Sequence, residues 1–114
     1  MLKMHRGWTL ATGDDGTTLR PEKFSLGNNY PNPFNPTTTI DFSVPVQSGV
    51  TFTIYNVLGE EMHRMSDDNL TSGVYRVRWN GKNKYGVQVP SGIYFYQLKA
   101  GDSFIQTKKM TLIK

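Results

Sequence analysis

The chain has 114 residues, the size of a single domain. With 37% hydrophobic and 19% charged residues it is neither intrinsically disordered nor membrane-embedded by composition, and without cysteine it can form neither disulfides nor thiolate metal sites. The net charge is +4, but the 13 lysines and arginines are scattered and no known nucleic-acid motif accompanies them, so we predict no nucleic-acid binding. No apolar run approaches the roughly 20 residues of a membrane-spanning helix.

Residues 1–23 lack regular alternation of apolar and polar side chains. We predict that they are a linker or the end of a preceding domain and add little to the fold, with some local order around Trp8. Residues 13–18 have the composition of a turn, and the adjacent Asp14 and Asp15 lack the alternating spacing of a calcium-binding loop. We therefore predict no metal site there.

A proline-rich segment, Tyr-Pro-Asn-Pro-Phe-Asn-Pro, spans residues 30–36. Each proline fixes its own φ and favours extended conformations before it, so the segment cannot be helical. We predict a rigid lead-in to the first main strand, with Tyr30 and Phe34 as apolar anchors. The alternative is a Pro-x-x-Pro ligand formed by Pro33 and Pro36, which the lack of a closely flanking basic residue disfavours.

Short segments with strand character follow one another from residue 37 onward. We predict strands at residues 40–44, 50–55, 61–65, 74–79, 93–98 and 104–113. Residues 66–69 are predicted to be a polar loop and residues 80–86 a glycine-rich connection. Six or seven short strands with turns between them indicate an all-β protein, an antiparallel β-sandwich.

Three of these strands carry specific expectations. Trp79 ends an alternating run and should be buried against Phe52 or Ile54. Residues 93–98 are apolar on both faces, which is typical of a central strand covered on both sides. Lys108 and Lys109 point to opposite faces of the last strand, and a lysine is costly to bury unpaired, so this strand should be an edge or carry a bulge.

Five segments, in order and spacing, resemble the type A C-terminal sorting domain of type IX secretion, which is similar to the Ig-like domain of the flagellar hook-cap protein. The segments are residues 30–40, 54–59, 79–86, 91–98 and 108–112. The resemblance covers residues 24–114. Its mainly structural motif residues are Tyr30, Pro31, Asn32, Pro33, Trp79, Gly81, Gly86, Gly92 and Tyr94.

The resemblance implies an immunoglobulin-like sandwich of about seven strands at the C-terminal end of an exported cargo protein. It further implies passage through the periplasm of a Gram-negative bacterium, recognition by an outer-membrane translocon and a sortase-like peptidase, and a secreted or cell-surface location. The candidate sorting-signal residues are Lys108, Lys109 and Lys114. We expect a signal peptide and a cargo domain upstream of these residues.

The sequence offers no catalytic constellation. His5 and His63 are far apart in the sequence, Ser91 lacks the Gly-x-Ser-x-Gly elbow of a nucleophile, and the neighbouring Glu60 and Glu61 point to opposite faces of a strand. We therefore expect no enzyme, no cofactor and no metal.

The alternative function is an Ig-like carbohydrate- or protein-binding module of a secreted protein. Small β-sandwiches often bind sugars through exposed aromatic side chains. The candidates are Tyr55, Tyr85, Tyr94, Phe95 and Tyr96. Tyr85 is expected to be the most exposed, and three coplanar exposed rings would favour a sugar ligand.

Overall fold

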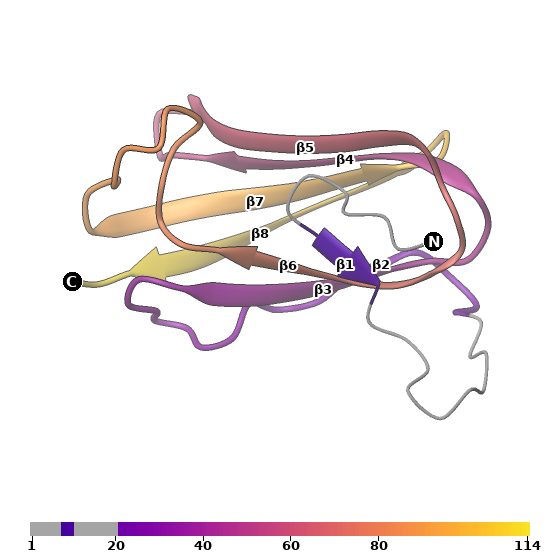
Figure 1. The fold of residues 1–114 in the computed structure, drawn as a ribbon, viewed down its shortest axis with the longest axis horizontal. Helices are drawn as coiled ribbons and strands as arrows, with labels where there is room; N and C mark the ends of the chain where they lie inside the picture. Colours follow the sequence, from indigo (N-terminus) through magenta and orange to yellow (C-terminus); the bar gives the residue numbers. More distant parts are fainter. Residues whose placement is uncertain (1–7, 11–20) are drawn as a thin grey trace.

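The computed structural model describes residues 8–10 and 21–114, which form β-strands and no helix. The strands are β1 (Trp8–Leu10), β2 (Ser25–Leu26), β3 (Thr38–Val44), β4 (Ser48–Tyr55), β5 (Glu61–Leu70), β6 (Gly73–Trp79), β7 (Gly92–Ala100) and β8 (Phe104–Leu112). They form two antiparallel sheets with the strand orders β1-β6-β3-β2 and β5-β4-β7-β8 (Figure 1). The predicted all-β antiparallel sandwich is confirmed. Within the described ranges no helix could cross a bilayer.

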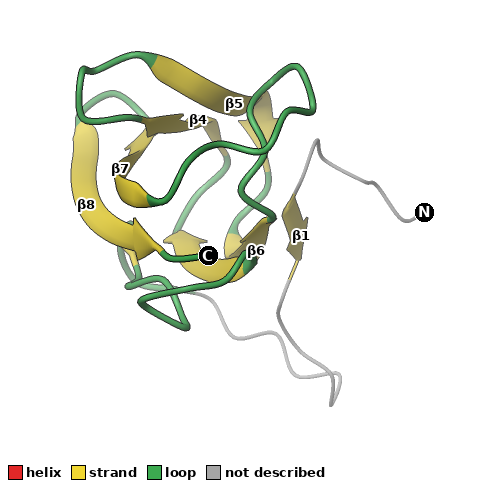
Figure 2. Cartoon of the chain, turned by 90° about the vertical axis from the view of Figure 1, so that its left-hand side faces the viewer, coloured by secondary structure: helices red, strands yellow, loops and turns green. Residues whose placement is uncertain are grey.

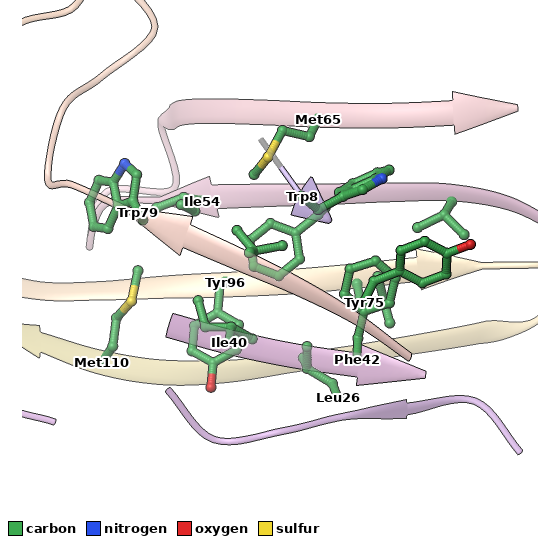
Figure 3. Close-up of a cluster of buried hydrophobic side chains, with 14 of the residues drawn as sticks. Trp8, Leu26, Ile40, Phe42, Ile54, Met65, Tyr75, Trp79, Tyr96 and Met110 are labelled. Atoms are coloured by element: carbon green, nitrogen blue, oxygen red, sulfur yellow. The ribbon is translucent and has the colours of Figure 1, made fainter. Parts of the chain in front are cut away.

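The sheets pack face to face through the alternating apolar side chains, with the C-terminal end of the chain beside β6 and β8 (Figure 2). Ile40, Phe52 and Val77 are completely buried. Trp79 is 3% exposed, so its predicted burial is confirmed, and the aromatic rings that pack on it are those of Phe34 and Tyr94, at 5.8 and 5.6 Å between centroids. Part of the core is shown in Figure 3.

Strand β1 corrects the expectation that residues 1–23 add little to the sandwich. It pairs antiparallel with β6, in the register Trp8 to Val77. Trp8 is 1% exposed and packs edge-on against Phe42, with 5.5 Å between ring centroids (Figure 3). A strand of three residues is too short to be recognised from alternating apolar and polar side chains. Its buried tryptophan nevertheless adds a large apolar surface to the core. Residues 13–18, for which we predicted a turn without a metal site, lie outside the described residues. His5 also lies outside them.

Residues 66–69, predicted to be a loop, continue strand β5. Asp67 pairs with Val50, and the register shifts between Ser48 and Val50. Strand β5 is an edge, where polar side chains reach water while backbone groups still pair with β4. The polar composition of residues 66–69 therefore indicates side chains that reach water, and it does not mark the end of the strand.

Strand β7 is central in its sheet but covered on one face only, contrary to the prediction. Tyr94, Tyr96 and Leu98 are buried, whereas Ile93 is 40% exposed and Lys99 is also exposed. Apolar side chains such as Ile93 and Phe95 lie on the outer face of β7, and no element of the described residues forms a layer over them.

We expect Trp8→Ala to lower the free energy of unfolding by about 3–5 kcal/mol, since it removes a buried aromatic ring and leaves a cavity. Leu10→Ala on the same strand is the matched control, because Leu10 is 56% exposed, and it should stay within about 0.5 kcal/mol. Unfolding in denaturant measures both. Equal effects of the two substitutions would contradict the packing of β1 on the core.

Candidate functional site

The three lysines proposed as sorting signals lie on or beyond β8, the edge strand of its sheet, as predicted for Lys108 and Lys109. Lys108 is opposite Tyr96 in the register and is half-buried, and its Nζ donates a hydrogen bond to Asn28 Oδ1 at 2.9 Å. Lys109 is opposite Phe95 on the outer face and is exposed, and Lys114 is exposed beyond the strand. The structure does not gather the three ammonium groups into one cluster.

The proline-rich segment pairs with the end of β8. Phe34 N donates to Thr111 O and Ile113 N donates to Phe34 O, both at 2.9 Å. Thr111 N donates to Asn32 Oδ1 at 3.0 Å. These bonds satisfy the outward backbone groups at the end of the edge strand, at Thr111 and Ile113, which would otherwise be free to pair with another chain. We call this set of contacts the C-terminal clamp.

Of the two predicted apolar anchors, Phe34 is confirmed and Tyr30 is wrong. Phe34 is 1% exposed and packs on Trp79. Tyr30 is 46% exposed, and its hydroxyl donates to Asp41 Oδ2 at 3.0 Å. Asp41 also forms an ion pair of 2.9 Å with Arg76. Tyr30 thus lies beside charged groups on the outer face of the sheet, where a phenol hydroxyl finds partners.

A buried polar network connects this segment to β7. Asn29 is 5% exposed, and its backbone N donates to Tyr96 Oη, which donates to Gly27 O, each at 2.9 Å. Asn29 Nδ2 donates to Thr38 Oγ1 at 3.0 Å and to Pro31 O at 3.2 Å. Burial raises the pKa of the Tyr96 phenol, and the hydrogen bond from Asn29 opposes that rise. The hydroxyl therefore stays neutral at ordinary pH and can both donate and accept.

The loop after β6 is built around Trp79. Its Nε1 donates to Lys82 O at 2.8 Å, and Tyr94 packs edge-on against its ring while donating to Pro90 O at 2.6 Å. Gly81 has a φ of 77°, and a side chain there would meet Gln88. These motif residues serve packing and backbone conformation in the structure.

The remaining motif residues, Gly86, Gly92 and Pro33, also lie in turns, at a strand end or beside the core. Gly86 has a φ of 78° in a turn where Asn83 Oδ1 accepts from Tyr85 N at 2.9 Å. Gly92 opens β7 opposite Leu112. Pro33 is exposed beside the buried Phe34.

The five aromatic residues considered for sugar binding do not share one exposed surface. Tyr85 is 78% exposed, as predicted. Tyr94 and Tyr96 are buried, whereas Tyr55 and Phe95 are half-buried partners in the register of β4 and β7. Three coplanar exposed rings are therefore not available from this set.

A depression that the sequence did not predict lies between β5, the end of β6 and the loop after it. It has a volume of about 640 Å³. Its lining residues are Thr37, His63, Arg78, Trp79, Asn80, Lys82, Asn83, Lys84 and Gly86. We call it the basic depression. No group of three or more His, Asp and Glu residues in the described part of the chain could hold a metal ion.

We expect Tyr96→Phe to destabilise the domain by about 1–3 kcal/mol, because it leaves the buried N–H of Asn29 and the carbonyl of Gly27 without their shared partner. Tyr85→Phe removes the same atom from an exposed ring and is the control. Denaturant unfolding of the two variants should separate them. Similar stabilities would show that water satisfies both backbone groups.

Protonation of His63 should destabilise the fold. Burial lowers its pKa from the usual 6.5, and nearby Glu61 opposes that shift only in part. The folded state then binds fewer protons than the unfolded state, so stability is full above pH 6.5 and falls as the pH drops through the lowered pKa. Compared with the wild type, His63→Gln should lose less stability between about pH 7.5 and pH 5 in denaturant unfolding. Parallel pH curves for the two proteins would refute this.

Comparison with protein families matches residues 28–103 to the FlgD Ig-like domain. No curated protein matches the chain. Among solved structures, dimeric latent PorU from Porphyromonas gingivalis matches 87% of this chain with a TM-score of 0.63 and 19% identity. PorZ, an essential bacterial surface component of the type IX secretion system of the same organism, matches 88% with a TM-score of 0.53 and 21% identity.

The FlgD structure from P. aeruginosa matches 83% of this chain, with a TM-score of 0.53 and 20% identity, and the match spans 78% of that protein. This chain spans only 10% of the PorU chain and 13% of the PorZ chain. At these identities the likenesses show the fold, which confirms the Ig-like sandwich. Because the family match covers most of the described sandwich, the chain belongs to the FlgD Ig-like domain family.

Proposed function

We propose that this chain is a C-terminal sorting domain that directs a cargo protein through the type IX outer-membrane translocon to the cell surface or the medium. The observation that carries the proposal is the C-terminal clamp. Two of the segments that resemble a sorting domain, residues 30–40 and 108–112, are far apart in the sequence and pair directly through Phe34 and Asn32. The segments thus form one folded unit around the last strand.

The proposal places the recognised surface on the outer face of β8. Lys109 is the strongest candidate, because it is exposed and lies beside the half-buried Phe95. Lys108 has a second role, since its ammonium group bonds to Asn28. The fold likeness to PorZ supports the link to type IX secretion. The partners in this proposal are the translocon, a sortase-like peptidase and the upstream cargo, and the chain itself has no catalytic role.

Export of a reporter tests the proposal. The reporter carries an N-terminal signal peptide and is fused before Met1, so that β1 is kept, and the host has a type IX system. We expect the wild-type domain to export the reporter and Lys109→Gln to reduce export severalfold without changing the melting curve, since surface substitutions usually cost within about 0.5 kcal/mol. Failure of the wild-type domain to export the reporter would refute the sorting function.

Two further variants locate the signal. Lys99→Gln changes the same charge on the neighbouring strand and should leave export unchanged. Lys108→Gln removes the bond to Asn28, so its melting curve shows whether any loss of export reflects stability. Unchanged export and unchanged melting for the double variant of Lys108 and Lys109 would exclude these lysines as recognised residues.

A further inference from the structure

The basic depression lies between β5 and the end of β6, and no residue of β8 lines it. Within the described residues, the pairs of β1 with β6 run from Tyr75 to Val77, and Arg78 and Trp79 end β6 next to the depression. His63 faces this opening from β5, which is the opposite edge of its sheet from β8. The depression is therefore separate from the surface assigned to sorting.

The lining is positively charged and contains no carboxylate. Arg78, Lys82 and Lys84 contribute cations, and no ion pair joins any of them to a carboxylate within the described ranges. The neighbouring Arg76 shows the contrast, because Asp41 neutralises it at 2.9 Å. Glu61 lies near His63 but pairs with Arg64, and three cations that form no ion pair of their own among the described residues produce a local positive potential that attracts anions.

The loop that carries two of these lysines is held in place by backbone bonds. Lys84 N donates to Met62 O at 2.7 Å, which ties the loop to β5. Trp79 Nε1 donates to Lys82 O at 2.8 Å, which ties it to β6. Asn83 N donates to Val87 O at 2.9 Å within the loop. A site built in this way needs little ordering when a ligand binds.

His63 lines the depression from the side of β5. Its Nδ1 is buried and has no hydrogen-bond partner among the residues that the structure describes. Nδ1 is therefore not exposed to the open depression, and a ligand there would meet the rest of the imidazole ring. The other ring nitrogen, Nε2, can donate to an oxyanion in the appropriate tautomer or when protonated.

We propose that the basic depression binds a phosphate group carried by a polar ligand, such as a sugar phosphate. The guanidinium of Arg78, the lysine ammonium groups and His63 match the several acceptor oxygens of a phosphate. A volume of about 640 Å³ exceeds what a bare phosphate fills. The side chains of Thr37, Asn80 and Asn83 in the lining provide hydrogen-bonding groups for hydroxyls of the remaining body.

Titrations of the ¹⁵N-labelled 114-residue chain with glucose 6-phosphate, glucose and inorganic phosphate, at constant ionic strength, test this proposal. We expect glucose 6-phosphate to shift the Trp79 indole N–H and the loop amides and to bind more tightly than inorganic phosphate. Glucose alone should produce no shifts. Equal affinity for inorganic phosphate would overturn the assignment of a polar body, and the absence of shifts with both phosphates would overturn the site.

Substitutions decide whether the binding is specific. Arg78→Gln and Lys82→Gln should each weaken glucose 6-phosphate binding by about tenfold, the equivalent of one charged hydrogen bond. Both side chains are exposed, so the melting curves should not change. Lys99→Gln lowers the net charge equally on the outer face of β7 and should leave the affinity unchanged. An equal loss of affinity in all three variants would show that only the net charge of the protein matters, and it would refute the site.

Discussion

The structure depends on a layer of aromatic rings that joins the two sheets. Phe42 of one sheet stacks on Phe52 of the other, with 6.3 Å between centroids, and Phe52 stacks on Tyr96 at 5.9 Å. Trp8 extends the layer at one end through its contact with Phe42. Each ring buries a large apolar area, so the layer supplies much of the driving force that holds the sheets together.

The same layer positions the features that bear on function. The ring of Tyr96 packs in the core, while its hydroxyl holds Asn29 and Gly27 at the start of the proline-rich segment. That segment then pairs with the end of β8 through Phe34. Hydrogen bonds therefore connect a core residue, a family motif and the C-terminal strand, and we expect a substitution that removes one of these bonds to disturb the neighbouring element.

Alternation along the chain was sufficient to predict the strands whose faces differ, such as β3 and β6, and the burial of Trp79. Alternation failed to predict strands in which backbone pairing does not depend on burial of the side chains. Residues 66–69 are polar yet paired, because an edge strand needs only backbone partners. Trp8 pairs with a strand almost 70 residues away in the sequence, and a three-residue strand contains too few alternations to detect.

The candidate sites, too, could be predicted from the sequence only in part. The sequence located Lys108 and Lys109 on an edge strand, because a charge cannot be buried without a partner. It could not reveal that Asn28 binds Lys108, since those residues are distant in the chain. The basic depression combines His63 with Arg78 and the following loop, which come together because that loop bonds to β5 through Lys84 N and Met62 O.

The Ig-like fold occurs in proteins that share only 19–21% identity with this chain, so the shared architecture does not by itself determine what the domain does. The residues that build the core and the C-terminal clamp serve stability first, and their loss would abolish any function that requires the folded domain. Specific function must then be sought among side chains that can change without unfolding. Lys109 on β8 and Arg78 on β6 meet this condition, because both are exposed and belong to opposite sides of the sandwich. Substitutions at these two positions can therefore separate the sorting surface from the basic depression while the common core stays intact.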